Sequence, residues 1–162
     1  MIKFHDLFTQ YGKDIYRFAL FLSGDQTEAE EITSETFARA ITGKAPLVSE
    51  SVKGYLLTIA RNLHLDSVRR QNRFKEISQE LPDSAINLEQ TVSHKTELEA
   101  VQAYLQNFPE VDRAALLLRA DDVPYDEIAN SLNITLSSAK VKVHRLRLKL
   151  AEWRTNREMI KI

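Results

Sequence analysis

The side chains best suited to chemistry in this sequence are cations and amides, and they gather in two stretches. Residues 139–153 hold five lysines and arginines before the first acid, Glu152. Residues 61–75 hold five more against Asp66 alone. Guanidinium and ammonium groups gathered in this way bind phosphates, and an amide such as Asn62 can pair with a base edge. The chemistry indicated is noncovalent binding of nucleic acid.

Covalent and metal chemistry find little support in the sequence. The four histidines show no metal-ligand spacing, and there is no cysteine. None of the four glycines belongs to a phosphate-binding loop or a nucleophile elbow. We therefore expect no enzymatic activity, no cofactor, no bound metal ion and no small-molecule substrate.

The distribution of charge along the chain is more informative than the net charge. A net charge of −1 gives no overall attraction to nucleic acid. Residues 25–35 hold five acids and no base, and residues 76–99 hold six acids against Lys95, so the basic stretches are separate patches. The lack of cysteine and of any apolar run of 18 residues favours a cytoplasmic protein without membrane insertion.

The stretch AKVKVHRLRLKLAEW, residues 139–153, alternates like a strand but also carries a helical stripe. The alternation changes parity at His144–Arg145, whereas the helical stripe is unbroken and contains no glycine or proline. Thr135, Ser137 and Ser138, just upstream, are N-cap candidates. We predict a helix with an apolar face formed by Ala139, Val143, Leu146, Leu150 and Trp153.

Residues 125–150 have the pattern of a helix-turn-helix. Small Ala129 permits close helix approach, and Asn133 tolerates the left-handed backbone of a tight turn. Leu132 and Ile134 close the angle between the helices. In this motif the second helix enters the DNA major groove. The alternative is an ordinary helical hairpin with a solvated basic face, but the unopposed positive charge favours DNA binding.

The remaining apolar segments also have helical spacing, which predicts an all-α fold in two small domains joined by an acidic linker. Thr27 is a candidate N-cap, and a long helix from Val52 brings Asp66 and Arg70 onto one face, where they can pair. The polar stretch from about residue 74 to 93 reads as the linker. The other predicted helices cover approximately residues 4–22, 27–43, 52–73, 96–106, 110–121 and 125–131.

Three stretches, in this order, resemble the extracytoplasmic-function (group 4) branch of the sigma-70 family of bacterial RNA polymerase. They are YRFALFLSGDQTEAEEITSETFARA, SVKGYLLTIARNLHLDSVRR, and FPEVDRAALLLRADDVPYDEIANSLNI followed by HRLRLKL. The resemblance implies a region 2-like domain over residues 1–74, a linker over 75–95 and a region 4-like helix-turn-helix domain over 96–162. It implies an RNA polymerase sigma factor, which directs core polymerase to promoters and assists their opening.

The resemblance implies that the second helix docks on core polymerase. Its sequence matches sigma region 2.2, which binds the coiled coil of the β′ subunit, while region 4 contacts the β flap. Charge alone leaves the acidic stretch 25–35 ambiguous, since acids near a helix start also complement the helix dipole. The residues implied in polymerase docking are Glu31, Ser34, Glu35 and Phe37.

The resemblance assigns the two basic stretches to two promoter elements. The loop at 42–51 and the helix after it match the part that recognises and melts the −10 element, where a flipped base needs a shaped pocket. The residues implied at the −10 element are Tyr55, Arg61, Asn62, Arg69, Arg70 and Arg73. Those implied at the −35 element are Ser137, Ser138, Lys140, Val141, Lys142, His144, Arg145 and Lys149.

Two departures from the family pattern leave the promoter sequence open. Family members commonly show Gly-Thr-Val-Lys-Ser-Arg entering the recognition helix. Here residues 137–142 keep Lys140 but carry Val141 and Lys142 in place of the serine and the arginine. Losing the arginine removes a bidentate fork suited to guanine. Tyr55 and the glycine before it stand where a tryptophan is frequent.

Two other functions fit parts of the sequence. A stand-alone helix-turn-helix regulator would need neither the acidic stretch 25–35 nor the loop at 42–51. A helical interaction protein would use its basic helix to bind an acidic partner, and unrelated duplex DNA would not compete. The family also implies an anti-sigma factor as inhibitor, although no residue identifies one.

Overall fold

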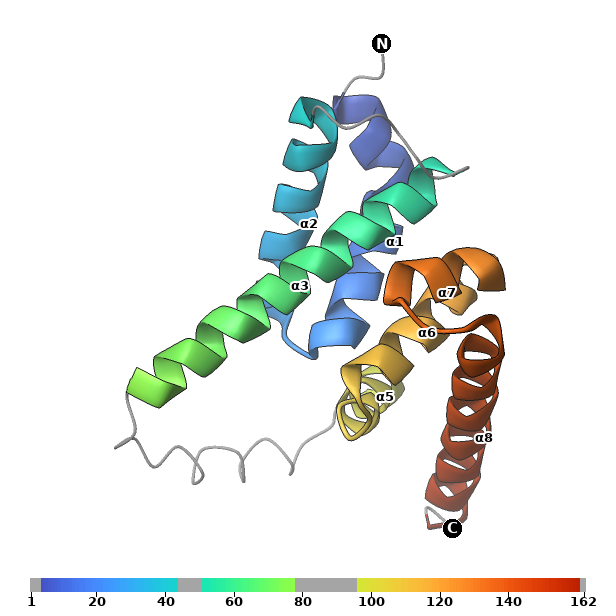
Figure 1. The fold of residues 1–162 in the computed structure, drawn as a ribbon. Helices are drawn as coiled ribbons and strands as arrows, with labels where there is room; N and C mark the ends of the chain where they lie inside the picture. Colours follow the sequence, from blue (N-terminus) through green and yellow to red (C-terminus); the bar gives the residue numbers. More distant parts are fainter. Residues whose placement is uncertain (1–3, 44–50, 78–95, 161–162) are drawn as a thin grey trace.

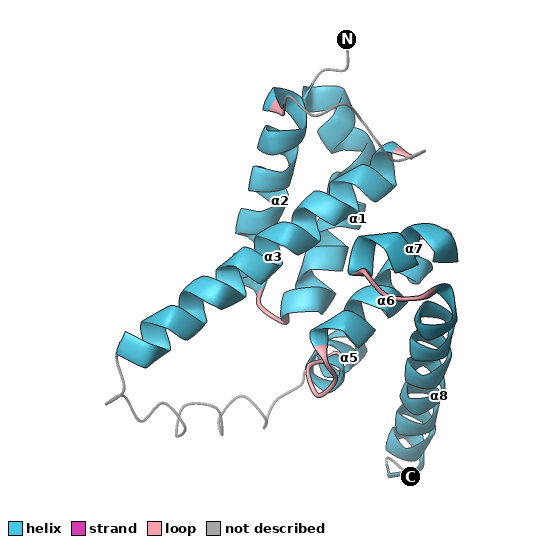
Figure 2. Ribbon diagram, in the orientation of Figure 1, coloured by secondary structure: helices cyan, strands magenta, loops and turns pink. Residues whose placement is uncertain are grey.

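The part of the chain that the computed structural model describes, residues 4–43, 51–77 and 96–160, forms helices and short turns and no strand (Figure 2). This confirms the predicted all-α fold. The predicted loop at 42–51 and linker at 75–95 lie mostly outside the described residues. The helices are α1 (Phe4–Ser23), α2 (Gln26–Thr42), α3 (Val52–Ile77), α5 (Glu97–Leu105), α6 (Glu110–Ala120), α7 (Tyr125–Leu132) and α8 (Leu136–Ile160).

The turn between α1 and α2 sets where the second helix begins. Gly24 has a left-handed backbone with φ of 72°, which glycine adopts without a Cβ penalty. Asp25 then caps α2, because its side-chain oxygen accepts a hydrogen bond from the backbone nitrogen of Glu28 at 3.2 Å. The prediction of Thr27 as the cap is wrong, since the helix has already begun at Gln26.

Helices α1, α2 and α3 form the N-terminal half, in which α3 crosses α1 and α2 (Figure 1). Its centre is made of side chains that are fully or almost fully buried, among them Phe18, Phe37 and Leu56. Burying each such side chain stabilises the fold by about 1.5–3 kcal/mol. Farther along α3, Asp66 pairs with Arg69 at 3.2 Å. The predicted pairing of Asp66 with Arg70 is therefore wrong, because the Asp66 carboxylate pairs with the arginine three positions later, not with the one four positions later.

Helices α5 to α8 form the C-terminal half, in which α6 and α7 both pack against α8. Asn133 has the left-handed backbone expected of it, with φ of 57° and ψ of 47°. Thr135 caps α8, since its hydroxyl oxygen accepts from the backbone nitrogen of Ser138 at 3.1 Å. The predicted helical stripe is confirmed by the buried side chains Ala139, Val143 and Leu146.

The two halves touch each other directly. Helix α1 packs against α5 and α6, and α3 also reaches α6 (Figure 1). Phe18 and Leu22 of the N-terminal half belong to the same buried apolar cluster as Leu105 and Leu118 of the C-terminal half. We call the contact of α1 and α3 with α5 and α6 the interface between the halves. The two predicted helical blocks therefore share one continuous core in this conformation.

Candidate nucleic-acid interface

The outer face of α8 presents most of the predicted recognition residues to solvent. Burial of Ala139, Val143 and Leu146 fixes which side of the helix faces the core. The opposite side therefore faces outward, as a helix must to enter a DNA groove. Ser137, Lys140, Val141, His144, Arg145 and Lys149 are exposed, and Ser138 and Lys142 are half-buried.

Neighbouring helices modify the charge of this face. The Tyr125 ring on α7 faces two cations: its centroid is 4.6 Å from the guanidinium carbon of Arg119 and 5.9 Å from Nζ of Lys140. Lys142 bonds Asp112 of α6 through Nζ at 3.1 Å. Lys142 is thus partly neutralised within the protein, while Arg145 stands exposed and is better placed to meet a phosphate.

The second basic face runs along α3 beyond the point where that helix crosses the bundle (Figure 1). Asn62, Arg69, Arg70 and Arg73 are exposed on this helix. Spacings of seven and four residues bring Asn62, Arg69 and Arg73 onto one stripe of a helix. A single groove or strand can therefore meet an amide and several guanidinium groups together.

Two of the residues predicted for the −10 element are less accessible. Tyr55 is half-buried near the start of α3. Arg61 is only 9% exposed, and its guanidinium binds the Glu110 carboxylate of α6 through two hydrogen bonds, from Nε at 2.8 Å and Nη2 at 2.7 Å. Such a bidentate pair is the geometry in which arginine binds carboxylates and phosphates most strongly.

The residues predicted for polymerase docking divide into two groups on α2. Glu31, Ser34 and Glu35 are exposed, and they share a face because they are three and four residues apart. Phe37 is fully buried, with its ring centroid 5.1 Å from that of Phe8. In this conformation Phe37 orients the helix rather than offering surface to another molecule.

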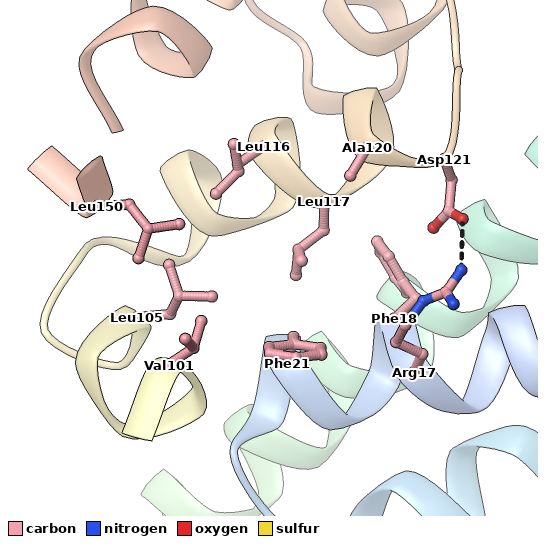
Figure 3. Close-up of a pocket in the computed structure, with 10 residues that line it drawn as sticks. All are labelled: Arg17, Phe18, Phe21, Val101, Leu105, Leu116, Leu117, Ala120, Asp121 and Leu150. Atoms are coloured by element: carbon pink, nitrogen blue, oxygen red, sulfur yellow. Dashed lines mark hydrogen bonds and ion pairs between the residues drawn. The ribbon is translucent and has the colours of Figure 1, made fainter. Parts of the chain in front are cut away.

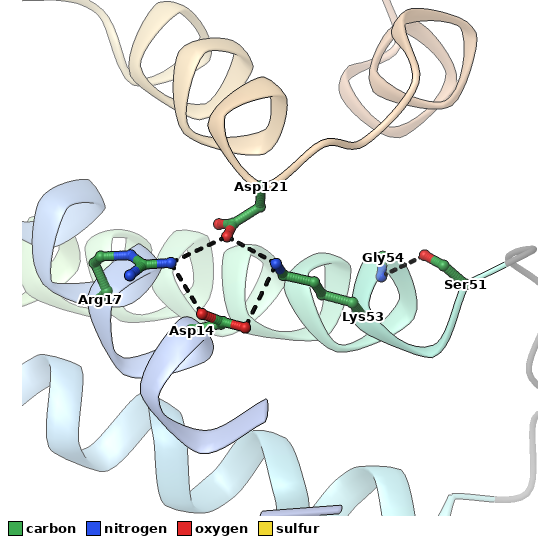
Figure 4. A network of polar contacts seen from close by, with 6 residues as sticks. All are labelled: Asp14, Arg17, Ser51, Lys53, Gly54 and Asp121. Carbon is green, nitrogen blue, oxygen red and sulfur yellow. Dashed lines mark hydrogen bonds and ion pairs between the residues drawn. The ribbon is translucent and has the colours of Figure 1, made fainter. Parts of the chain in front are cut away.

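A four-membered charge network joins the two halves (Figure 4). Asp121, at the end of α6, lies 3.4 Å from Nη2 of Arg17 and 3.1 Å from Nζ of Lys53, and both cations also pair with Asp14. Burial alone would lower the pKa of Lys53, but hydrogen bonds and charge from Asp121 and Asp14 outweigh it and raise the pKa. This network could not be predicted from the sequence, because among its members only Asp14 and Arg17 have the spacing of helical neighbours.

A buried polar contact joins α2 to α3. Nδ1 of His64 lies 3.5 Å from Oε2 of Glu28, and both side chains are largely withdrawn from solvent. The adjacent His64 imidazole is the largest influence on Glu28 and lowers its pKa, burial raises the pKa, and Ser67 and Ser23 lower it further. The contact between His64 and Glu28 could not be predicted from the sequence, because the two residues are 36 positions apart and no short-range spacing connects them.

Within residues 4–43, 51–77 and 96–160, no group of three His, Cys, Asp or Glu side chains is arranged to hold a metal ion. None of the helices in these ranges is long and apolar enough to cross a membrane.

Comparison with known proteins gives family matches in both halves. The family model of sigma-70 region 2 matches residues 7–74, and that of sigma-70 region 4 matches residues 98–150. The ECF RNA polymerase sigma factor SigE of Mycolicibacterium smegmatis is 33% identical, over 94% of this chain and 62% of that protein. The ECF RNA polymerase sigma factor SigM of Bacillus subtilis is 31% identical, over 90% of this chain and 91% of that protein.

The fold is also found among solved structures. The sigma factor RpoE of Bartonella quintana, crystallised in complex with the anti-sigma factor NepR, superposes with a TM-score of 0.70. The superposition covers 91% of this chain and 95% of that one at 21% sequence identity. The shared feature is therefore the arrangement of helices in both halves.

Proposed function

The chain belongs to the extracytoplasmic-function branch of the sigma-70 family, and from this membership we propose that it directs core RNA polymerase to two-part promoters and assists their opening. The family models of region 2 and region 4 match in the expected order. The helices of each region also present an exposed polar face. In this role the protein binds and positions, and it performs no covalent chemistry of its own.

The exposed face of α2 is the proposed docking site for core polymerase. Glu31, Ser34 and Glu35 point to solvent on one side of the helix, while Phe37 packs inward against Phe8. A rigid acidic face of this kind suits a basic, helical partner surface such as the β′ coiled coil. We assign the β flap contact to the C-terminal half.

Helix α3 is the proposed reader of the −10 element. Its exposed guanidinium groups, on Arg69, Arg70 and Arg73, suit the backbone of a separated strand, and the Asn62 amide suits a base edge. Holding a base out of the stack costs a few kcal/mol. We propose that Tyr55 borders the pocket that offsets this cost, and that Arg61 joins the phosphate contacts.

Helix α8 is the proposed reader of the −35 element, with α7 as the supporting helix of the motif. The exposed residues that support this role run from Ser137 to Lys149. Asn133 provides the turn that sets the angle between the two helices. We place the region 2-like domain at residues 1–74, the linker at 75–95 and the region 4-like domain at 96–162.

The cellular setting follows from the same assignment. Core polymerase and promoter DNA are cytoplasmic in bacteria, so we place the protein in the cytoplasm. The Bartonella quintana relative is bound by an anti-sigma factor, and we propose that a protein inhibitor of that class also binds this chain.

The observation that carries the proposal is the presence of both family-matched regions in one chain, each with solvent-facing polar residues. The test is co-purification with bacterial core polymerase, followed by sequencing of transcripts made from fragmented genomic DNA. We expect a stable complex and discrete start sites preceded by two shared sequence elements. DNA binding without polymerase binding would instead indicate a stand-alone helix-turn-helix regulator.

A further inference from the structure

The last turns of α3 carry an apolar surface that the other described helices leave exposed. Helix α3 runs beyond α1 and α2, and its final turns lie apart from both (Figure 1). Phe74 and Ile77 lie on these turns and are 63% and 83% exposed. Phe74 is the most exposed of the seven phenylalanines in the chain. An exposed ring on a projecting helix is available to a binding partner.

Phe74 belongs to the same stripe of α3 that packs this helix into the N-terminal half. The stripe contains residues at spacings of four and three, which lie on one face of a helix. Its members are Leu63, Ser67, Arg70, Phe74 and Ile77. Leu63 is buried and Ser67 is half-buried, but the stripe is exposed from Arg70 onward. The apolar face of α3 therefore continues past the bundle into solvent.

Cations surround this apolar surface. Residues 69–77 contain a single acid, Glu76, and four cations, which are Arg69, Arg70, Arg73 and Lys75. Arg70 lies on the same face as Phe74, since it comes four residues earlier. Arg69 is partly neutralised by Asp66 at 3.2 Å, but the segment as a whole keeps an excess of positive charge. A second copy of this helix end would be repelled by it, so the charge favours an anionic partner.

Two other apolar surfaces lack this combination of an exposed ring and excess cations. A cavity of about 400 Å³ between α1, α5, α6 and α8 is lined mainly by apolar side chains (Figure 3). Its charged lining residues, Arg17 and Asp121, bind each other at 3.4 Å, so neither is an unopposed charge. The partly exposed rings of Phe4 and Phe8 stack with centroids 5.8 Å apart, and both pack against Phe37. The end of α3 is therefore the better candidate for binding an anionic partner.

A nucleotide of a separated DNA strand has the chemistry that this surface fits. Its base has a π-face that stacks on an aromatic ring, and its phosphate binds the cations beside that ring. Bases inside an intact duplex are already stacked, and taking one out costs a few kcal/mol. Phe74 follows Asn62 by 12 residues, or about 18 Å along the helix axis, which is the length of about five stacked nucleotides. One opened strand can therefore reach both residues.

We propose that the Phe74 ring stacks on a base of the separated promoter strand, while Arg70 and Arg73 bind the neighbouring phosphates. The contact adds affinity for an opened strand without selecting its sequence, because every base has a π-face. Ile77 extends the apolar surface beside the ring but has no π-face of its own. This inference rests on the proposed function, because it takes α3 as the helix that meets the opened strand.

Abasic nucleotides test the stacking contact directly. The probe is a fluorescent single strand that carries the −10 sequence read from the mapped start sites with its flanking nucleotides, bound by core polymerase carrying this chain. We expect Phe74→Ala to bind the intact strand about tenfold more weakly than the parent, equivalent to about 1.4 kcal/mol. An abasic site at one position should weaken the parent by a similar factor and leave Phe74→Ala unaffected. Equal effects of every abasic site on both proteins would overturn the inference.

Further substitutions separate stacking from burial of apolar surface. Phe74→Trp keeps a π-face and should bind the strand at least as tightly as the parent, whereas Phe74→Leu keeps apolar volume only and should resemble Phe74→Ala. Ile77→Ala is the matched control, because it removes an even more exposed apolar side chain from the same face, and it should change the affinity less than about twofold. Parent-like binding by Phe74→Leu would rule out stacking.

Other partners for this surface predict different results, each of which would overturn the inference. A protein surface on Phe74 would make Phe74→Ala weaken assembly with core polymerase while the assembled complex binds the strand normally. A contact with another part of this chain would make Phe74→Ala lower the melting temperature. A ring inserted into intact DNA would make Phe74→Ala weaken binding to duplex and single-stranded probes equally.

A titration without polymerase separates this inference from the proposed function. If the chain does not assemble with core polymerase, the proposed function is refuted, and the free chain is then titrated with a thymidine strand of about 20 nucleotides. Binding by Phe74→Ala that is about tenfold weaker than binding by Ile77→Ala would still support a stacking site for single strands. Equal affinities of the two variants, or no binding by the parent, would refute the site.

Discussion

The Arg113 guanidinium donates from Nε to the backbone oxygen of Leu22 at 3.1 Å and from Nη1 to that of Phe108 at 2.6 Å. One side chain thus binds the last turn of α1 and the turn that precedes α6. Carbonyls at a helix end lack intrahelical partners, and a cation there also complements the helix dipole. The position of the C-terminal half against α1 depends directly on this residue.

Arg113→Ala should therefore destabilise the fold strongly. It leaves two inward-facing carbonyls without a charged donor, and hydrogen bonds to charged groups contribute about 1.5–3 kcal/mol each. We expect a loss of about 2–4 kcal/mol in the free energy of unfolding, measured by urea titration. Lys13→Ala, at an exposed helical position, serves as the control and should change the free energy of unfolding by less than about 0.5 kcal/mol. Equal stabilities of the two variants would contradict the structural role of Arg113.

Glu35→Ala should weaken polymerase binding far more than DNA binding. Glu35 is exposed and pairs with Arg39, four residues on in the same helix, so the fold should tolerate the change. We expect affinity for core polymerase to fall about tenfold, equivalent to about 1.4 kcal/mol. Affinity for the −35 duplex should stay the same in a fluorescence anisotropy titration. Equal losses in both assays would refute the assignment of separate roles to α2 and α8.

Arg145→Ala should weaken binding to −35 duplex DNA. If Arg145 contacts a phosphate, its loss reduces the number of counterions released on binding, and the slope of log affinity against log salt becomes shallower by about 1. Arg154→Ala removes an equally charged side chain of α8 that pairs with Glu97 instead, and its slope should match the parent. An unchanged slope for Arg145→Ala would remove this residue from the DNA contact.

Asn133 should tolerate glycine but not a branched residue. Its φ of 57° lies in the left-handed region, which glycine enters freely and β-branched residues enter only with strain. We expect Asn133→Gly to retain stability, while Asn133→Val loses about 1–3 kcal/mol. Differential scanning calorimetry of the two variants measures this difference. Equal melting temperatures would show that the turn does not need a left-handed residue.

Glu28 should make stability depend on acid pH. Its pKa is lowered from an ordinary value of 4.5, chiefly by the adjacent His64 imidazole, so the folded state favours the ionised form. That contribution is fully present above pH 4.5 and is lost as the pH falls through the folded pKa. We expect Glu28→Gln to be less stable than the parent at neutral pH, with a difference that shrinks as the pH falls below about 5. Urea titrations across this range measure it, and a constant difference would contradict the assignment.

Elements with local determinants could be predicted from the sequence. The left-handed turn at Asn133 and the buried stripe of α8 depend on residues within one or two helical turns, and both are confirmed. Thr135, one of three cap candidates, is the residue whose hydroxyl accepts the hydrogen bond. Residues that interact within one or two helical turns occur at regular spacings in the sequence, so these features could be predicted from it.

The predictions were wrong where two nearby residues could fill the same role, as a helix cap or as an ion-pair partner. Asp25 and Thr27 are both good caps, and helix propensity alone does not choose between them. Asp66 can reach a cation three or four residues on, and the structure pairs it with Arg69. Which of two nearby partners is used depends on side-chain geometry, and the residue types alone do not specify that geometry.

Contacts between the halves could not be predicted from the sequence. Arg61 and Glu110 are 49 residues apart, and nothing in the spacing of either marks the other. The basic stretch around Arg61 suggested phosphate binding, yet the structure pairs that guanidinium with a carboxylate. The accessibility of a cation depends on the tertiary fold, so the role of each of these residues remains a prediction.

The packing of α1 against α6 also has a consequence for synthesis on the ribosome. Arg17 meets Asp121, a residue 104 positions later in the chain. At about 5–20 residues per second, roughly 5–20 s separate the translation of the two. During that interval Phe21 and the rest of the α1 surface that later faces α5 and α6 have no partner to cover them. A nascent chain of this protein therefore exposes an apolar surface that is prone to aggregation for several seconds. Chaperones that recognise exposed apolar surfaces can bind it during that interval.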